Sequence, residues 1–472
     1  MASHAVAGAR PPSPVRGRVW QAAVAIAICI AAAGIGGFAG KSPKDALAAV
    51  AVAAFLPIVV TRFTLGVGIF IVSTFLGLSG TAQKGIGLVV IVVAIGHLIN
   101  DRRSTPNFFA DHRRLTGLIL VYLAWCVLGM TWATSTHDVI YSLERYIPNF
   151  LVLFVVYAAA RDRLDARLLA VFFVLGSAVA VGDAILHPAA GDAGVSRLGG
   201  AFGDPNYLAA VLVTGFALSL ALASARTLPA LARAAASVAG GLCLLGILLS
   251  VSRGGLIALG VSLAVAVVVA GRWRARLAFA AIVVALAGLG YFALLAPASS
   301  RQRIVSSAGG GSGRTTIWKV GWREVQHNTL LGVGAGNFST AGAHYVFEPG
   351  LINHNAVGFT AYFLDTPTVA HNTYLEVLAE EGLPGACVFF GLVALCLVCA
   401  QRAALRFRAA GDDQLELISY GLLCGTIGFL AASFFLSEEY SKQLYLLMAM
   451  GPALLHVAQR PVRFAPGAIS RG

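Results

Sequence analysis

The sequence predicts an all-α polytopic membrane protein with about 12 to 14 transmembrane helices and one long loop outside the membrane. Three observations lead to this fold class. The 472 residues are 58% hydrophobic and 12% charged, and their mean hydropathy is +0.80. Soluble proteins are about half apolar and one-quarter charged, so we expect a large part of this more apolar chain to lie in lipid. Apolar runs of about 14 to 22 residues also recur along the chain, with most Arg and Lys residues in the gaps between them.

The apolar runs define the candidate spans in chain order. They are 19–38, 46–60, 65–78, 85–99, 116–132, 148–160, 167–186, 206–223, 235–251, 255–270, 275–296, 383–400, 415–434 and 442–456. Runs of about 15 residues are marginal for a bilayer core, so the count falls to about twelve if short N-terminal pairs merge. The predicted organisation is an N-terminal tail (1–18), a helical bundle (19–296), a long loop (297–382), C-terminal helices (383–457) and a tail (458–472).

Alternate gaps carry clusters of arginine, which assigns them and both termini to the cytoplasm. These gaps are 101–114, 161–167, 226–233, 272–276 and 402–408. The other gaps, including the long loop, then face outward, which in a Gram-negative bacterium is the periplasm. The net charge of +13 is explained by these loops at the ends of the spans, so no nucleic-acid partner is predicted.

Several other sites are not indicated by the sequence. The seven cysteines lie in or at the ends of apolar runs, so a disulfide framework or zinc site is not expected. The basic start followed by an apolar run is similar to a signal peptide, but no clean A-x-A cleavage site follows, and we expect an uncleaved first span. The outward loops lack D-x-D and H-E-x-x-H, and no phosphate-binding loop for ATP is present, so no metal or cofactor is predicted.

Two arginines are predicted to lie on the outward side. Arg197 lies in VSRLGGAFGDPNYLA, where Asp204 and Pro205 break the chain and Asn206 can cap the next helix. Arg253 lies in a tight turn between two apolar runs, followed by two glycines. An arginine near the membrane surface is often only an anchor. The positive-inside bias makes outward arginines less expected, however, and the guanidinium fork matches phosphate oxygens.

His371 is the main candidate for acid–base chemistry. It begins the segment HNTYLEVLAEEGLPG, where the long loop re-enters the membrane, and Asn372 is near the cap position of a helix. Histidine can act as a general base near neutral pH. The other loop histidines, His327, His344 and His354, are scattered and read as structural.

The long loop is also rich in aromatic residues. These are Trp318, Trp322, Phe338, Tyr345, Phe347, Phe359, Tyr362 and Phe363. Such side chains could stack on sugar rings, or form a small separate core or interfacial anchors, and the sequence leaves these alternatives open.

Five segments in the C-terminal 60% of the chain resemble, in order, those of the O-antigen ligase and O-antigen polymerase superfamily, the WaaL and Wzy proteins. They are R-x-x-G-x-F-x-D-P-N (197–206), S-R-G-G (252–255), G-R-x-x-x-W (313–318), L-L-G-x-G-x-G-x-F (330–338) and H-N-x-Y-L-E-x-L-x-E-x-G-x-x-G (371–385). The resemblance implies a fold like that of glycosyltransferase-C enzymes, a catalytic His371, and diphosphate binding by Arg197 and Arg253. Arg314, Asn372 and Glu380 are implied to be supporting residues.

The function implied by this resemblance is metal-independent glycosyl transfer from an undecaprenyl-diphosphate-linked oligosaccharide at the periplasmic face of the inner membrane. The acceptor is either another lipid-linked glycan, as in a polymerase, or the lipid A core, as in an O-antigen ligase. The sequence slightly favours the polymerase, whose partners would include a flippase and a chain-length regulator. A transporter or flippase of lipid-linked sugars is the competing class, but no internal repeat or mid-membrane ionisable set supports it.

Overall fold

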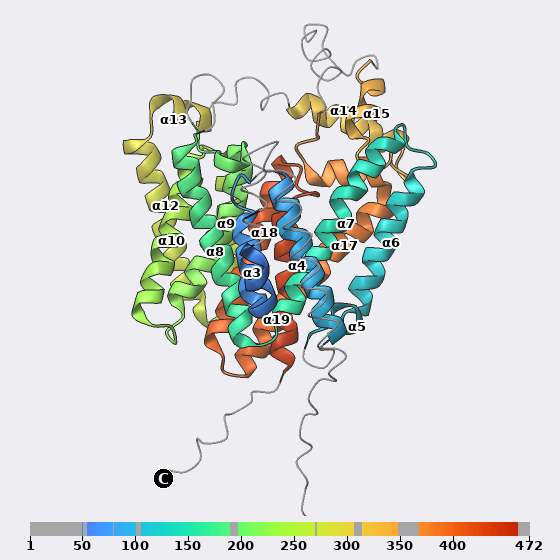
Figure 1. Ribbon diagram of the computed structural model, residues 1–472. Helices are drawn as coiled ribbons and strands as arrows, with labels where there is room; N and C mark the ends of the chain where they lie inside the picture. Colours follow the sequence, from blue (N-terminus) through green and yellow to red (C-terminus); the bar gives the residue numbers. More distant parts are fainter. Residues whose placement is uncertain are drawn as a thin grey trace, which may run out of the picture.

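The computed structural model describes residue 50 and residues 54–78, 80–100, 105–188, 197–269, 271–305, 314–347 and 368–460. Within these ranges the chain folds into helices and contains no strand element, which confirms the all-α class (Figure 1). Eight described helices are long and apolar enough to cross a membrane. The protein is therefore a multi-pass membrane protein.

The eight helices follow one another along the chain. They are α4 (Gly80–Asn100), α7 (Thr136–Ala159), α8 (Arg163–Leu186), α9 (Pro205–Ser224), α10 (Ala230–Leu249), α12 with its flanking turns (Gly271–Leu295), α17 (Thr373–Ala409) and α18 with its last turn (Asp413–Phe435). Shorter helices complete the bundle: α3 (Phe63–Ser73), α6 (Arg113–Gly129), α11 (Arg253–Val269) and α19 (Lys442–Gln459). The predicted first span, 19–38, lies outside the described residues.

The predicted start of one span at Pro148 is wrong. Helix α7 begins twelve residues earlier, at Thr136, because the Ser135 side chain accepts a hydrogen bond from the Asp138 amide and caps it. Pro148 lies inside the helix. The polar residues before Pro148, which hydropathy alone assigned to a gap, form the outer turns of α7.

Helices α9 and α18 form the centre of the bundle. They pack closely enough for the Thr214 hydroxyl on α9 to donate a hydrogen bond of 2.9 Å to the Gly425 carbonyl on α18. A Cβ added at Gly425 would lie 2.8 Å from the Thr214 Cα, so glycine permits this approach. In contrast, α12 (Arg274–Gly290) has no buried residue and lies at the edge of the bundle.

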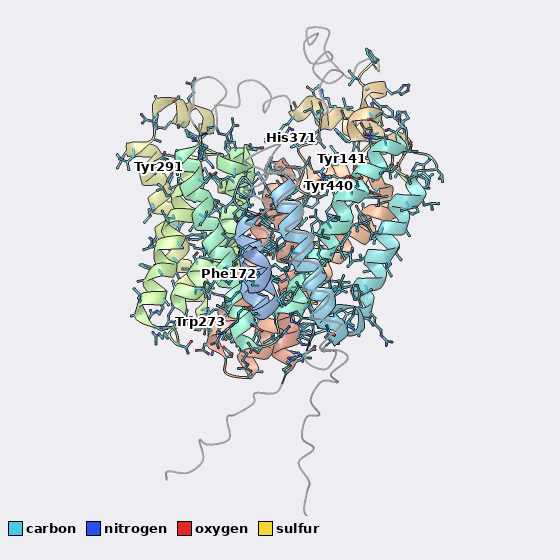
Figure 2. The ribbon with its side chains drawn as sticks, in the orientation of Figure 1. Tyr141, Phe172, Trp273, Tyr291, His371 and Tyr440 are labelled. Atoms are coloured by element: carbon cyan, nitrogen blue, oxygen red, sulfur yellow. The ribbon has the colours of Figure 1, made fainter. Side chains whose placement is uncertain are left out.

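Three of the predicted arginine-rich gaps meet at one end of the bundle, where Figure 2 labels Trp273. Arg163 forms an ion pair of 2.9 Å with Asp412. Arg272 pairs with Asp413 at 2.8 Å and also contacts Glu416, which in turn lies 4.0 Å from Arg408. These three gaps, which the sequence assigns to the same side of the membrane, therefore lie together in the structure.

In its described part, the long loop forms α13 (Ala298–Val305), α14 (Arg314–His327) and α15 (Phe338–Tyr345) before α17 begins, and these helices lie at the opposite end of the bundle (Figure 1). Helices α14 and α15 pack on the start of α17 around a small apolar core, separate from that of the bundle. Its buried members are Ile317, Val320, Val325, Phe338, Val346, Ala370 and Ala379. We call this end of the bundle the loop end.

Candidate active site

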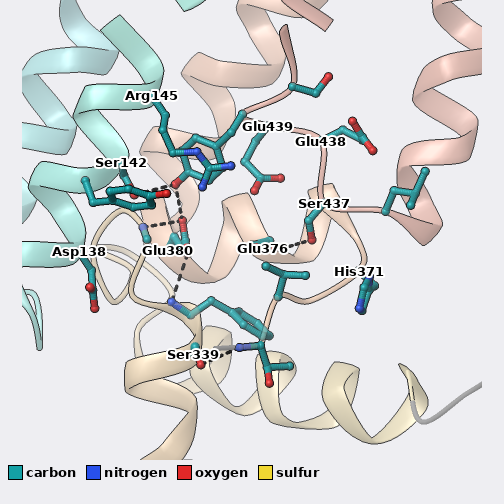
Figure 3. A pocket seen from close by; sticks show the side chains of 18 of the residues that line it. Asp138, Ser142, Arg145, Ser339, His371, Glu376, Glu380, Ser437, Glu438 and Glu439 are labelled. Atoms are coloured by element: carbon teal, nitrogen blue, oxygen red, sulfur yellow. Dashed lines mark hydrogen bonds between the residues drawn. The ribbon is translucent and has the colours of Figure 1, made fainter. Parts of the chain in front are cut away.

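A cavity of about 960 Å³ lies at the loop end of the bundle. We call it the main cavity. Figure 3 shows side chains that line it, and Figure 2 places Tyr141, His371 and Tyr440 at this end. Its wall consists of Asp138, Tyr141, Ser142 and Arg145 of α7, Asp204 and Tyr207 at the start of α9, residues of 336–343, residues of 368–380, and Leu436 to Ser441.

His371 lines this cavity across from Arg145 and Ser142 (Figure 3). Its backbone has a φ of +49°, a left-handed conformation that is uncommon for residues other than glycine. Among the described residues, Val251 is the only other non-glycine residue with a positive φ, of +50°, and it lies two residues before Arg253. Strained backbone of this kind clusters at functional sites, where the surrounding structure holds it in place.

Hydrogen bonds fix the chain on both sides of His371. Trp318 Nε1 donates to the Ala370 carbonyl at 2.9 Å, and the Ala370 amide donates to a Glu376 carboxylate oxygen at 3.0 Å. Asn372 caps α17, since its side-chain oxygen accepts from the amides of Tyr374 and Leu375. Hydrogen bonds within the protein itself therefore fix the backbone that carries the imidazole.

Burial lowers the pKa of His371 below its usual value of 6.5, and the positive charge of Arg314 lowers it further. The negative charge of Asp204 acts in the opposite direction but is the smallest of the three effects. The imidazole is therefore mainly neutral at pH 7, the state in which it can accept a proton. Two segments distant in the sequence, around Asp204 and around Arg314, both act on this histidine.

Arg197 is buried, with 6% of its surface exposed. Its Nε donates to the Ser250 carbonyl at 2.9 Å, and one terminal nitrogen donates to Asn206 Oδ1 at 3.1 Å. The same Asn206 oxygen accepts from the Ser252 hydroxyl at 2.8 Å. The R-x-x-G-x-F-x-D-P-N and S-R-G-G segments therefore meet at this one amide.

The predicted capping role of Asn206 is wrong, because α9 begins at Pro205 and Asp204 is its N-cap. The Asp204 carboxylate accepts from the Asn206 backbone amide at 2.7 Å, so the aspartate satisfies the first free N–H group of the helix. The Asn206 side chain is thereby left to join Arg197 and Ser252.

Arg253 is the first residue of α11 and is exposed, so its guanidinium is at the rim of the bundle. Neither Arg197 nor Arg253 lines the main cavity, and neither does Arg314, the first residue of α14. Gly254, next to Arg253, packs near the Phe435 ring, which lies beside Trp318. Through these aromatic rings, the start of α11 adjoins the segment that holds His371.

Glu380 ties the glycine-rich segment 330–338 to α17. Its carboxylate accepts from the amides of Gly336 at 2.8 Å and Phe338 at 3.2 Å, and lies 3.2 Å from the Tyr440 hydroxyl. The same segment is joined to α7, because the Asn337 side chain accepts from the Ser135 amide and donates to the Ser135 carbonyl. Glu380 and Asn337 therefore join the glycine-rich segment to α17 and to α7.

Helix α17 is kinked at Gly382, where φ is +62° and the glycine-rich segment crosses it. A Cβ at this position would lie 2.3 Å from the Leu330 carbonyl oxygen, closer than any real contact. Gly382→Ala is therefore expected to destabilise the protein by about 1–3 kcal/mol or more, measured as a lower thermal unfolding temperature in detergent. The matched control is Gly391→Ala, in the same helix with open space at the Cβ, which should be neutral or stabilising. Equal effects of the two substitutions would contradict this account of the kink.

Several residues of the cavity wall are not predicted from the sequence. Arg145 lies 3.9 Å from the centre of the Tyr440 ring, a cation–π distance. Glu438 and Glu439 also line the cavity. Burial raises the pKa of Glu438 well above its usual range, and burial together with the charge of Glu380 raises that of Glu439 to about 8. Both carboxyl groups can therefore donate as well as accept hydrogen bonds at neutral pH.

The aromatic residues of the long loop have different surroundings. Phe338 is buried in the small apolar core, and Trp318 packs near Phe434 with its N–H bonded to the chain. Trp322 and Phe347 are exposed. The described aromatics therefore serve partly as a separate core, and Phe359, Tyr362 and Phe363 lie outside the described residues.

The chain is thus a multi-pass membrane protein with a polar cavity at one end, walled by carboxyl groups, tyrosines, one arginine and one histidine. Residues 238–390 match the family model described as O-antigen ligase, which confirms the resemblance of this segment to the O-antigen ligase and polymerase superfamily. The segment includes Arg253, Arg314, His371, Asn372 and Glu380, whereas Arg197 precedes it. No curated protein matches the chain. The family match of residues 238–390 supports a glycosyl-transfer role of the ligase or polymerase type.

Proposed function

We propose that the protein polymerises a glycan carried on undecaprenyl diphosphate, at the periplasmic face of the bacterial inner membrane. The observation that carries this proposal is the convergence of distant segments on one cavity. His371 lines the cavity beside Asp204, and Trp318, Glu376 and Glu380 hold the segments around it. The family match of residues 238–390 supports glycosyl transfer as the chemistry.

In the proposed reaction, an acceptor hydroxyl attacks the anomeric carbon of the donor glycan. The bond between that carbon and the diphosphate oxygen breaks, and its electron pair leaves with the diphosphate. His371 takes the proton of the attacking hydroxyl, which makes the oxygen a better nucleophile. Its lowered pKa keeps the imidazole neutral and ready to accept this proton at pH 7.

The leaving diphosphate gains negative charge in the transition state, so cations nearby stabilise it. We assign this role to Arg253, whose exposed guanidinium can bind two phosphate oxygens. The buried Arg197 supplies a second positive charge. Arg197 uses two of its nitrogens on Ser250 and Asn206, so it contributes mainly charge and a fixed loop. No metal ion is assigned a step.

The test is a transfer assay with purified full-length protein in detergent. Lipid-linked glycan extracted from the source bacterium serves as donor and as acceptor, with EDTA present throughout. We expect longer lipid-linked products, separated by gel electrophoresis, and no requirement for added metal. Transfer only to a lipid A core acceptor would replace the polymerase by a ligase. Loss of product on addition of EDTA would overturn the metal-independent mechanism.

The orientation is tested by cysteine labelling in a cysteine-free background. Lys319, exposed on α14, and Gly411, exposed between α17 and α18, lie at opposite ends of the bundle. Lys319→Cys is expected to react with a membrane-impermeant maleimide in intact spheroplasts, whereas Gly411→Cys should react only after lysis. Labelling in the reverse order would show that the cavity faces the cytoplasm.

A further inference from the structure

A second, smaller cavity of about 320 Å³ adjoins the main cavity. We call it the side cavity. The two share Tyr207, Tyr440 and Ser441 as wall residues. The rest of the side cavity is formed by the end of α3, the start of α4, residues 201–202 and the start of α19. The side cavity therefore lies next to the main cavity, and Tyr207 and Tyr440 form the wall between them.

The two cavities differ in charge. Six residues with carboxyl groups line the main cavity, together with Arg145 and His371. Among the described residues that line the side cavity there is no carboxylate, and the charged residue is Lys442. A ligand that extends through both would therefore meet carboxyl groups at one end and a cation at the other.

Lys442 is half-buried, and its ammonium group donates to the side-chain oxygen of Gln83. Within the described part of the chain it has no ion pair, and the nearby charge of Lys84 repels it. The other polar side chains have partners within the wall: Gln443 bonds to Thr74 and Tyr207, and Ser441 caps α19. Lys442 thus supplies positive charge with no counter-ion among the described residues, and the N-terminus of α19 adds to it.

We propose that the side cavity binds a phosphate group of the acceptor substrate, with Lys442 as its counter-charge. This inference rests on the proposed function and deepens it, because it makes the acceptor a glycan that carries phosphate at its far end. The acceptor glycan would cross the main cavity with its reacting hydroxyl at His371. Its phosphate would lie beyond Tyr207 and Tyr440, away from the donor diphosphate assigned to Arg253.

The arrangement follows from the positions of the charges. A phosphate in the main cavity would face the aspartates Asp138 and Asp204, whereas the side cavity offers a cation and side-chain amide groups. Two phosphate sites, one in the side cavity and one at Arg253 on the rim of the bundle, fit a reaction in which both substrates are lipid-linked. A single phosphate site would suffice for transfer to an acceptor without phosphate.

The first test measures binding of geranylgeranyl diphosphate to the purified full chain in neutral detergent, by calorimetry. We expect two sites in the wild type. Lys442→Gln should weaken one of them at least about tenfold, while Lys442→Arg should retain it. Arg253→Gln should weaken the other. Lys319→Gln, which removes an exposed lysine outside both cavities, is the matched control and should change neither.

The outcomes separate the inference from the proposed function. Unchanged binding in Lys442→Gln overturns the side-cavity site, whatever Arg253→Gln does. Weakening by Lys442→Gln but not by Arg253→Gln supports the side cavity and removes Arg253 from the donor site. If phosphatidylglycerol at equal concentration displaces the probe from the Lys442 site, a bilayer lipid is the ligand and the acceptor assignment fails.

The second test uses the transfer assay with two acceptors, the lipid-diphosphate-linked glycan and the same glycan after removal of its diphosphate. Lys442→Gln is expected to raise the KM for the first about tenfold, with kcat and the donor KM unchanged. The KM for the second should not change. An equal effect on both acceptors would overturn the phosphate assignment, and absence of transfer by the wild type would instead refute the proposed function.

Discussion

His371→Ala is expected to lower the rate of glycosyl transfer by about 10²-fold or more, the effect typical of a lost general base. Among the described residues that line the main cavity, His371 is the only histidine. The substitution leaves the segments that hold it in place, because these bond through the backbone of Ala370 and through Asn372. Unfolding temperature and binding of the lipid-linked donor should therefore stay near those of the wild type. Initial rates with purified protein provide the measurement.

The matched control for this substitution is His344→Ala, since His344 is exposed on α15 and does not line the cavity. Its rate should equal that of the wild type. Near-normal turnover by His371→Ala would remove the general-base assignment. An equal loss in both variants would point to a disturbed loop instead.

The pH dependence follows from the direction of the pKa shift. Burial and Arg314 lower the pKa of His371, so the imidazole stays neutral down to a pH below its usual 6.5. A base is active above its pKa and is lost as the pH falls through it. The acidic limb of the profile of kcat/KM is therefore expected below pH 6.5. An acidic limb above that value would contradict the environment described for this histidine.

Arg253→Lys is expected to reduce transfer nearly as much as Arg253→Ala, about 10²-fold for the alanine variant and within about tenfold of that for lysine. Lysine keeps the charge but cannot bind two phosphate oxygens with a planar fork. Donor titrations in the transfer assay measure the change in kcat and KM. An anchor at the end of a helix would, in contrast, tolerate lysine.

Arg301→Lys is the matched control, because Arg301 is exposed on α13, also at the loop end, and lines neither cavity. It should leave transfer unchanged. Full activity of Arg253→Lys would rule out the bidentate diphosphate contact and leave Arg253 with an anchoring role.

Much of the fold could be predicted because the membrane imposes a long apolar run on every span. The predicted start of the span at Pro148 is wrong because polar residues before it are also helical. Residues 136–147 are helical although they are polar, since Ser135 caps them and they extend α7 beyond the apolar stretch. The predicted cap of α9 is wrong because both Asp204 and Asn206 are residue types that cap helices, and the sequence alone does not distinguish them.

For the candidate site, the five sequence segments indicate candidate residues but not the residues that these contact. The sequence gives no indication that Asn206 joins Arg197 to Ser252, because this contact depends on the packing of α9 against α11. Arg145 could have been found, since it lies in a predicted outward gap and the argument applied to Arg197 applies equally to it. The pair Glu438 and Glu439, in another short outward gap, offered a similar signal.

The attachment of the glycine-rich segment has a mechanical consequence. Glu380 holds this segment to α17 and Asn337 holds it to α7, so the segment joins the outer ends of two helices. It cannot open by itself like an ordinary surface loop, because its release would require both attachments to break together. Room for a bulky substrate therefore has to come from other parts of the cavity wall.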